Sequence, residues 1–392
     1  MTIEELLIRG VDEIIVEDSF KAKLKSEKKL RIKMGFDPTK PDLHLGHLVG
    51  LRILKKLQEM GHTIIFIIGD YTAKIGDPSG RNTSRPTLTD KEIKANTNTY
   101  FEQVGKILDI DKAEIVCNSK WFDKMSFSDV INLTTKFTVA KIIEREDFQK
   151  RIQEKHDIGM QETLYPMMQA YDSIMIKADV EFGGSDQKLN MLFGRALQKK
   201  MGMEPQDVVT VKLLVGLDGK KKMSKSLGNY IALNDSPQDM FGKIMSIPDD
   251  LIIEYFKLCT DVTMPALKII EKELKEGKNP RDVKSELAKV IVEMYHSAEA
   301  AEKAAQEFEK VFSKREKPSE IPVQKIEVSE CRMDDLLMKC QLAPSRSEAK
   351  RLIEQGGVEV EGEKVTNPYQ SIQIKDEMVV QVGKRKYVKI KR

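Results

Sequence analysis

The stretch that decides the fold is residues 30–68, LRIKMGFDPTKPDLHLGHLVGLRILKKLQEMGHTIIFII. Its first seven residues alternate apolar and other side chains, as a β-strand does. A turn-rich DPTKPD segment follows, and apolar residues then recur at helical spacing from Leu45 to Met60, before Gly61 ends the pattern. Residues 63–68 are a β-branched run typical of a strand buried on both faces. This strand–helix–strand unit predicts a doubly wound, parallel-sheet (Rossmann-like) α/β domain.

The rest of the chain adds strands to this domain and then changes character. Residues 114–117, 179–182 and 208–215 are further strand candidates, and the pattern between 90 and 171 is mostly helical, so we expect that segment to insert into the sheet or to cap it. Helical patterns dominate from Ser236 to about Val311. We therefore expect four regions: a sheet domain (1–232), an α-helical domain (233–315), a linker (316–328) and a small α+β module (329–392).

Composition limits the class of protein. The chain has 392 residues, of which 40% are hydrophobic and 32% charged, which excludes a mostly disordered or collagen-like chain. The longest strongly apolar run, residues 64–68, is far too short to cross a bilayer. The four cysteines form no CxxC pair, so we expect neither a disulfide framework nor a zinc site, and a reduced cytoplasmic setting fits best.

The basic excess lies at the end of the chain. Residues 329–392 contain 13 Lys and Arg against 10 Asp and Glu, so this module carries a charge of +3, which equals the net charge of the whole chain. Six of the last nine residues are basic. The pattern is compatible both with a surface that binds a polyanion and with a solvated terminus.

The first chemical motif is His44-Leu45-Gly46-His47, at the point where the exit loop of a strand enters a helix. A helix N-terminus attracts phosphate through its unpaired N–H groups, two imidazoles can add hydrogen bonds, and Gly46 lets a nucleotide approach the backbone. Taken alone, the two histidines are also compatible with helix caps or with an adventitious metal pair.

The second motif is Lys222-Met223-Ser224-Lys225-Ser226, flanked by Gly219 and Gly228. Lysines on a loop of this kind can neutralise the charge that grows on a departing pyrophosphate, whereas a solvated basic loop is the plain alternative. An HxGH motif at the first strand–helix crossing, with KMSKS far downstream, resembles the class I aminoacyl-tRNA synthetases. In that family the two motifs flank ATP and stabilise the transition state for attack on the α-phosphate.

Two further segments point to the amino acid. Tyr165, Gln169 and Asp172 have the spacing of one helix face, and Gly183-Gly184-Ser185-Asp186-Gln187 follows a strand. With GFDPT at 35–39 and GDPSG at 76–80, they resemble the tyrosyl-tRNA synthetases, and the KMSKS spelling and Glu181 suggest the second bacterial subgroup. The tail from about Met333 resembles a ribosomal-type RNA-binding module, so the resemblance covers essentially the whole chain.

The resemblance implies a tyrosine–tRNA ligase with tyrosine, ATP and tRNA as substrates, Mg²⁺ on the phosphates and no metal site in the protein. It implies a homodimer formed through the inserted segment, an anticodon-binding role for the helical domain and RNA binding by the C-terminal module. The implied catalytic residues are Thr39, His44, His47, Lys222 and Lys225. The implied ATP-binding residues are Asp37, Gly46, Arg81, Arg85, Gly184, Asp186, Met223 and Ser224.

By the same resemblance, Asp77, Tyr165 and Gln169 would hold the α-ammonium of tyrosine, Asp172 would accept a hydrogen bond from its hydroxyl, and Gln187 would lie near its carboxylate. The implied tyrosine-binding residues are Gly35, Asp77, Tyr165, Gln169, Asp172 and Gln187. The implied tRNA-binding residues are Arg346, Lys350, Arg351, Lys384, Arg385 and Lys386.

The sequence departs from the better-known subgroup at Lys33, where that subgroup has a tyrosine that bonds the substrate hydroxyl, and also at Met34 and Glu181. Lys33 either turns away or takes part through its ammonium group. Three alternatives remain open at this point. The first is a tryptophanyl-tRNA synthetase, which shares both motifs; the second is a small-molecule nucleotidyltransferase; the third is an RNA-binding protein that has kept the fold and lost catalysis.

Overall fold

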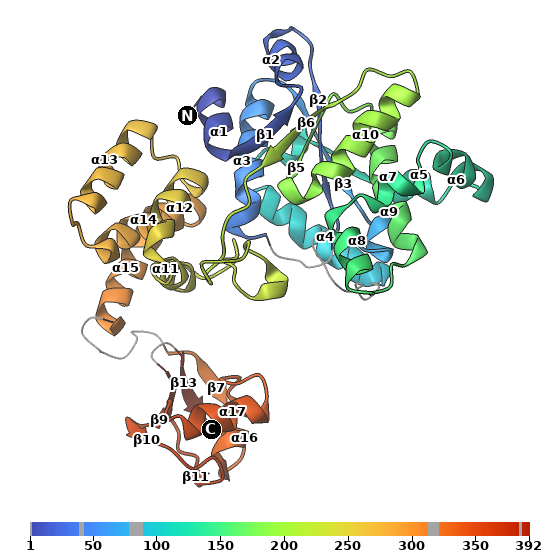
Figure 1. Cartoon of the computed structure of the whole chain (residues 1–392). Coiled ribbons are helices and arrows are strands. Elements are labelled where there is room, and N and C mark those ends of the chain that lie inside the picture. The colour runs from blue at the N-terminus through green and yellow to red at the C-terminus, as the bar shows by residue number, and fades with distance from the viewer. Residues whose placement is uncertain (1, 39–42, 78–88, 313–320, 384–385) are drawn as a thin grey trace. The chain divides into compact units, whose positions relative to one another are not determined.

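The structure of the chain is a computed structural model that describes all residues except 1, 39–42, 78–88, 313–320 and 384–385 (Figure 1). It divides into two compact units, Met1–Ala301 and Glu302–Arg392. The division falls inside helix α15 (Ala298–Phe312). The fold class predicted from residues 30–68 is confirmed in the first unit.

A six-stranded sheet forms the centre of the first unit, in the order β1-β6-β5-β2-β3-β4. Five of its strands run parallel, and β1 pairs antiparallel with β6 at one edge. The chain leaves β2 toward β3 and leaves β5 toward β6 on the other side, so the crossover helices α3 and α10 cover opposite faces. The strands are β1 (Val11–Ile15), β2 (Arg31–Phe36), β3 (Thr63–Ile68), β4 (Glu114–Cys117), β5 (Val180–Gly184) and β6 (Asp207–Val211).

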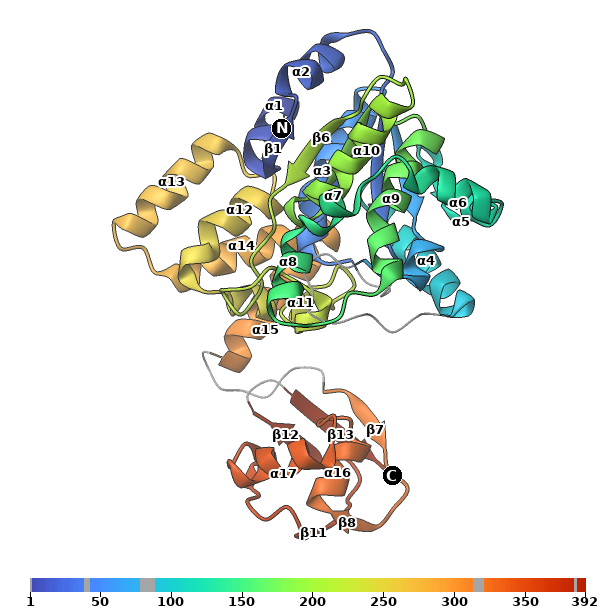
Figure 2. The same cartoon turned by 45° about the vertical axis from the view of Figure 1, so that its right-hand side comes forward.

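Helices surround this sheet and continue into an all-helical region (Figure 2). The N-terminal half of the first unit contains α1 (Ile3–Gly10), α2 (Glu17–Lys25), α3 (Leu45–Glu59), α4 (Asp90–Val104), α5 (Ser119–Phe122), α6 (Phe127–Thr134) and α7 (Val139–Ile143). The second half contains α8 (Glu146–Gln153), α9 (Met160–Met175), α10 (Lys188–Lys200), α11 (Pro237–Met245), α12 (Ile252–Cys259), α13 (Met264–Lys275) and α14 (Pro280–Tyr295). The helix predicted over 45–60 is α3, and the helical pattern expected from Ser236 begins with α11, whose N-cap is Ser236.

Two details of the sheet differ from the expectation. The antiparallel edge strand β1 was not foreseen, because it is a five-residue segment with an irregular register against β6. The strand expected at 208–215 ends at Val211, where the chain turns toward the KMSKS loop. By contrast, the strand predicted at 114–117, within the mostly helical segment 90–171, is confirmed as β4, which pairs with β3 and forms the opposite edge of the sheet.

Two buried arginines attach the helical region to the sheet region. Arg9 on α1 donates to the carbonyls of Phe256 (3.0 Å) and Thr260 (3.0 Å), and Arg52 on α3 donates to those of Leu258 (3.0 Å) and Thr260 (2.6 Å). These carbonyls end α12, where a helix has unpaired acceptors and a negative dipole end. Arg52 therefore fixes α3, the helix whose first residues include His47, against the end of α12.

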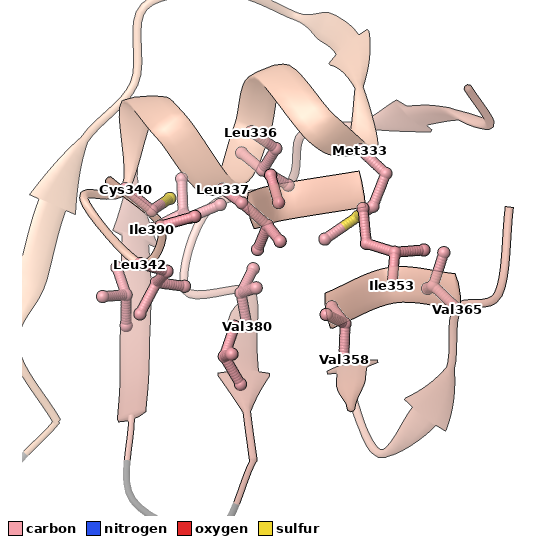
Figure 3. Packing of buried hydrophobic residues seen from close by; sticks show 14 of the residues in the cluster. Met333, Leu336, Leu337, Cys340, Leu342, Ile353, Val358, Val365, Val380 and Ile390 are labelled. Carbon is pink, nitrogen blue, oxygen red and sulfur yellow. The ribbon is translucent and has the colours of Figure 1, made fainter. Parts of the chain in front are cut away.

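The second unit is a small α+β module with its own core. Its helices are α16 (Met333–Lys339) and α17 (Arg346–Glu354), and its strands are β7 (Val323–Lys325), β8 (Glu330–Arg332), β9 (Val358–Val360), β10 (Glu363–Lys364), β11 (Ser371–Gln373), β12 (Val379–Val382) and β13 (Lys386–Lys391). Figure 3 shows the two helices packed on the sheet through fully buried side chains such as Leu336, Leu337, Ile353, Val380 and Ile390.

The linker expected at 316–328 is too long at its C-terminal end. Residues 323–325 form β7, which pairs in parallel with β13 and so belongs to the sheet of the module. Residues 316–320 lie outside the described part of the chain. Among the helices that the structure describes, none combines the length and the apolar character needed to traverse a bilayer.

Candidate active site

A cavity of about 470 Å³ lies at the carboxyl ends of β2, β5 and β6. In an open α/β sheet this is where ligands bind, at the point where the chain order reverses between neighbouring strands, here β2 and β5. The described residues that were predicted to act in catalysis or to bind ATP or tyrosine all line it: Gly35, Asp37, His44, Gly46, His47, Asp77, Tyr165, Gln169, Asp172, Gly184, Asp186, Gln187, Lys222, Met223, Ser224 and Lys225. Thr39, Arg81 and Arg85 lie outside the described residues.

The two signature motifs are joined directly by the main chain. Leu45 N donates to Ile231 O (3.1 Å), and Leu233 N donates to Leu43 O (2.9 Å), so the segment after KMSKS pairs with the residues that lead into α3. Gly46 is also required by space. A Cβ atom at this position would lie 3.1 Å from the imidazole of His44 and 3.7 Å from Cβ of Met223. About 175 residues separate the motifs in sequence, yet they form one wall of the cavity.

Burial favours the neutral form of both histidines of the first motif. Burial, followed by the charges of His47 and Lys225, lowers the pKa of His44 to about 2, and burial and Lys225 lower the pKa of His47 to about 4. Nδ1 of His47 accepts from the main-chain N of His44 (3.2 Å), so its proton lies on Nε2, which is a donor. Nδ1 of the buried His44 has no partner among the described residues. A ligand that brings hydrogen-bonding oxygen atoms would satisfy it.

Asn229 organises the KMSKS loop. Its Oδ1 accepts from Ser224 N (2.8 Å), and its Nδ2 donates to Asp218 Oδ2 (2.9 Å) and to Lys222 O (3.2 Å). Gly216 leaves room for this amide, since a Cβ there would lie 2.3 Å from Nδ2 of Asn229. This side chain holds the base of the loop together with main-chain bonds such as that from Met223 N to Leu214 O (2.7 Å), and Lys222 and Lys225 line the cavity.

Lys222 forms an ion pair with Asp186 at the cavity. Its Nζ lies 2.5 Å from Oδ2 of Asp186, and both side chains are partly exposed. Asp186 follows β5 and Lys222 belongs to the loop after β6, so the pair links the ends of neighbouring strands. A partly exposed pair of this kind contributes little free energy, and ligand groups can displace it.

The carboxylate of Asp172 is the buried acid of the site. Its Oδ1 accepts from Trp121 Nε1 (3.0 Å), and Asn118 Nδ2 lies 3.5 Å from its Oδ2. Burial raises its pKa to about 7, although the positive charge of Lys33 and these two donors act in the opposite direction. The carboxyl group of Asp172 is therefore a strong hydrogen-bond acceptor above about pH 7, where it is ionised, and a weaker one below that pH, where it is protonated.

The ammonium group of Lys33 is held by three protein acceptors. Its buried Nζ lies 2.8 Å from Oε1 of Glu181, and it donates to Gln169 O (2.9 Å) and to Ser173 Oγ (2.9 Å). These three acceptors match the three N–H groups of an ammonium. These partners are the ones expected if Lys33 turns away, which is the first of the two possibilities that the sequence leaves open.

Other predicted residues bond one another around the cavity. The hydroxyl of Tyr165 donates to Asp37 Oδ2 (2.9 Å), and Gln187 Nε2 donates to Asp77 Oδ2 (2.7 Å). Asp37 also accepts from Thr72 Oγ1 (2.9 Å), so its carboxylate fixes the polar wall as well as facing the cavity.

Sequence reasoning missed the residues that support these side chains. They are Trp121 and Asn118 beside Asp172, Thr72 beside Asp37, Asn190 beside Gln187, and Ser173 and Gln206 beside Glu181. No local motif marks them, and most act through partners 25 or more residues away, although Asn190 lies three residues from Gln187 and Ser173 eight residues from Glu181. Trp121 offers the one usable signal, since it is the single tryptophan of the chain.

The residues predicted to bind tRNA lie in the second unit. Arg346, Lys350 and Arg351 are on α17, and Lys386 begins β13 with an exposed side chain, whereas Lys384 and Arg385 lie outside the described residues. Lys350 donates to the hydroxyl of Tyr369 (3.1 Å), and its Nζ lies 4.8 Å from the centre of that exposed ring. Arg346 and Arg351 form exposed ion pairs that a polyanion can replace.

Comparison with known proteins gives one consistent picture. Residues 25–313 match the family model described as class I tRNA synthetases (W and Y), and residues 313–390 match the C-terminal domain of tyrosine–tRNA ligases. The chain is 50% identical to a tyrosine–tRNA ligase of Thermotoga maritima, over 100% of this chain and 98% of the relative. It is 48% identical to tyrosine–tRNA ligase 2 of Clostridium acetobutylicum, over 98% of this chain and 97% of the relative.

Solved structures share the fold. A tyrosyl-tRNA synthetase of Archaeoglobus fulgidus in complex with L-tyrosine superposes with a TM-score of 0.63 at 24% identity, covering 77% of this chain and 99% of that one. A truncated mitochondrial tyrosyl-tRNA synthetase of Aspergillus nidulans gives a TM-score of 0.65 at 23% identity, covering 79% and 94%.

Proposed function

Because this chain belongs to the tyrosine–tRNA ligases, a branch of the class I aminoacyl-tRNA synthetases, we propose that its cavity holds tyrosine and ATP side by side and joins them before tRNA is charged. The chain is an enzyme that ligates tyrosine to tRNA. Full-length relatives at about 50% identity carry that activity in their names, and this sets aside the tryptophanyl, nucleotidyltransferase and non-enzymatic alternatives. The observation that carries the proposal is the cavity itself, with both nucleotide motifs on one wall and Asp172 buried in it.

In the first step the carboxylate of tyrosine attacks the α-phosphorus of ATP in line, and the bond to the β-phosphate oxygen breaks. The products are tyrosyl-adenylate and pyrophosphate. In the second step a ribose hydroxyl at the 3′ end of tRNA attacks the tyrosyl carbonyl, releases AMP and loses its proton. Neither step requires an enzyme nucleophile, because the adenylate is the activated species. The protein contributes position and charge.

The residues divide this work by their chemistry. His44 and His47 are neutral donors beside a helix N-terminus, so they bind phosphate oxygens, and Lys222 and Lys225 add positive charge as pyrophosphate leaves. Asp186 exchanges Lys222 for the ribose hydroxyls when the nucleotide binds. Asp172 accepts from the tyrosine hydroxyl, and Asp77, Tyr165 and Gln169 surround the α-ammonium. Thr39, Arg81 and Arg85 retain their proposed roles at the phosphates.

We propose that Mg²⁺ enters on the phosphates of ATP. Within the described ranges no group of three or more His, Cys, Asp or Glu side chains is placed to hold a metal ion. Bound to the phosphates, the ion would supply charge that stabilises the departing pyrophosphate. We place the reaction in the cytoplasm, where the four cysteines, all unpaired here, would stay reduced.

The experiment that tests the function is ATP–pyrophosphate exchange on the purified protein. We expect exchange that depends on tyrosine and that tryptophan does not support. Exchange driven by tryptophan, or no exchange with any amino acid, would contradict the proposal. Charging of tRNA with labelled tyrosine then reports the second step.

The pKa of Asp172 predicts how tyrosine recognition depends on pH. The ionised carboxylate is the stronger acceptor, and it is lost as the pH falls through about 7. We therefore expect kcat/KM for tyrosine, relative to that for phenylalanine, to fall between pH 8 and pH 6. Exchange rates measured with both amino acids across this range test the prediction. A ratio that is constant with pH would show that Asp172 does not titrate in the free enzyme.

We propose that the enzyme is a homodimer, formed through the surface around α5 and α6. Phe127 is 80% exposed and Ile131 48% exposed on α6, beside a second cavity of about 790 Å³ that Trp121, Met125 and Leu133 help to line. Apolar side chains gathered in this way are typical of a surface that another chain covers.

For this surface, Phe127→Asp is expected to convert the dimer to a monomer, because it places a charge in an apolar interface. Sedimentation at micromolar concentration measures the change, and Ile269→Asp on α13, where the apolar side chain is 59% exposed, serves as the control. A wild-type enzyme that sediments as a monomer would refute the proposed dimer.

The C-terminal module is proposed to bind tRNA mainly through its phosphates. Replacing Arg346 and Lys350 with alanine is expected to weaken tRNA binding and to reduce the slope of log K against log salt concentration by about 1.5, since each phosphate contact contributes about 0.7–0.9. Pyrophosphate exchange stays unchanged. Lys364→Ala on β10 of the same module is the matched control. An unchanged slope in the double variant would place the tRNA contacts elsewhere.

A further inference from the structure

We propose that Lys33 and Glu181 are positioning residues that set the orientation of Gln169 and so create the acceptor for the α-ammonium of tyrosine. The inference rests on the proposed function, because it assigns the ammonium to Gln169. Neither residue bonds the substrate in this scheme. Both act through Gln169.

The two residues form a fully buried pair at the cavity. They are register partners on the neighbouring strands β2 and β5, with side chains that are 0% and 2% exposed. Lys33 Nζ and Glu181 Oε1 lie 2.8 Å apart. Burying two charges costs more than their attraction returns unless further hydrogen bonds satisfy the remaining groups. In this site the further bonds go largely to a single helix, α9.

Gln169 is held by both its main chain and its side chain. Lys33 Nζ donates to its carbonyl oxygen (2.9 Å), and its own Nε2 donates to Oε1 of Glu181 (3.2 Å). One turn later, Ser173 accepts from Lys33 (2.9 Å) and donates to Oε2 of Glu181 (3.2 Å). The pair therefore fixes two successive turns of the helix against the sheet.

The chemistry of the amide makes this orientation consequential. An ionised carboxylate only accepts hydrogen bonds, so Glu181 requires the NH₂ end of Gln169 to face it, and this leaves the carbonyl end as an acceptor. A cationic ammonium needs that acceptor. If the amide rotated by half a turn, it would present N–H groups to the cation. Glutamine alone has little preference between the two orientations, whereas Glu181 selects one.

Both carboxylate oxygens of Glu181 already accept hydrogen bonds from protein groups. Its Oε1 meets Lys33 and Gln169, and its Oε2 accepts from Ser173 and from Gln206. Lys33 has likewise matched its three N–H groups. The pair thus accounts for two departures of this sequence together. A lysine introduced at 33 without the glutamate at 181 would leave a buried unpaired charge.

The test compares two ligands in binding experiments without ATP: L-tyrosine and 3-(4-hydroxyphenyl)propionate, which has the same phenol and carboxylate but no ammonium. For Glu181→Gln we expect the Kd of tyrosine to rise about tenfold, the effect of losing one hydrogen bond to a charged group. The Kd of the propionate should change by less than about twofold, because it makes no use of the orientation of Gln169.

A second variant separates the effect on the orientation of Gln169 from the effect on the thermal stability of the protein. Lys33→Met combined with Glu181→Gln contains no unpaired charge, so it should regain thermal stability relative to Glu181→Gln while the Kd of tyrosine stays raised. It also carries the measurement if Glu181→Gln is too unstable to purify. The matched control is Lys23→Met, which breaks the buried pair Lys23–Asp207 (2.9 Å) away from the cavity lining and should lower the Tm without changing either Kd.

Three results would overturn the inference. These are equal weakening of both ligands, no weakening of tyrosine, and recovery of wild-type tyrosine affinity in the double variant together with its stability. Tyrosine-dependent exchange by the wild-type enzyme is measured separately. Its absence refutes the proposed function, whereas its presence with unchanged Kd values in the variants refutes only the role of the pair.

Discussion

Asp172→Ala is expected to raise the KM for tyrosine about 100-fold and to abolish most of the preference for tyrosine over phenylalanine. The variant removes a buried acceptor for the phenolic hydroxyl, and a hydrogen bond to a charged group contributes on the order of 2–3 kcal/mol. Phenylalanine has no hydroxyl to donate, so it would leave the buried carboxylate with only its protein donors Trp121 and Asn118, and we propose this lost bond as the source of the discrimination. Strong rejection of phenylalanine is already known for tyrosyl-tRNA synthetases, and we propose that Asp172 is responsible for it in this chain.

The measurement is kcat/KM for exchange with each of the two amino acids. Trp121→Phe is the control, because it removes one donor to Asp172 and keeps the carboxylate, so the preference should largely survive. An unchanged ratio of tyrosine to phenylalanine in Asp172→Ala would show that another group reads the hydroxyl. Lys33 would then be the next candidate, and its three present partners would have to be released.

Lys225→Ala is expected to lower kcat for exchange by two to three orders of magnitude while the KM for ATP changes by less than about threefold. Charge on the leaving pyrophosphate develops in the transition state, so a cation directed at it acts mainly there. The position of Lys225 agrees with this role, because it lines the cavity and its charge lowers the pKa of both His44 and His47.

The chain supplies a control for this loop. Lys220 and Lys221 belong to the same loop, are exposed and do not line the cavity, so Lys220→Ala should leave both constants near wild type. Pre-steady-state formation of the adenylate separates chemistry from product release. A parallel loss of ATP affinity and rate in Lys225→Ala would indicate ground-state binding instead of transition-state stabilisation.

The core of the fold was predictable because its signals are local. Residues 30–68 contain a complete strand–helix–strand unit, and helix α3 and strands β2 and β3 form where the pattern places them. The antiparallel β1 was not predictable in this way, because its pairing with β6 depends on residues nearly 200 positions away. Strand β7 was missed for the same reason, since it is three residues long and is defined only by its partner β13.

The candidate site likewise has features that are local in sequence, which could be predicted, and features that depend on tertiary packing, which could not. HxGH and KMSKS are contiguous motifs, and the sequence predicts that both belong to one nucleotide site, which fits their position on one wall of the cavity. The environment of a residue is not contained in a motif. The residues next to Asp172 in the sequence do not reveal the burial that raises its pKa. Likewise, the residues next to Lys33 do not reveal its hydrogen-bond partners. Both depend on how α9 packs on β2 and β5.

A crystal structure with a stable analogue of tyrosyl-adenylate, such as tyrosinol adenylate, tests the central claim most directly. The account predicts the phosphate between the His44 and His47 side and the Lys222 and Lys225 loop, with the phenolic oxygen within hydrogen-bonding distance of Asp172. A phosphate remote from either motif, or a phenol bound away from Asp172, would contradict it.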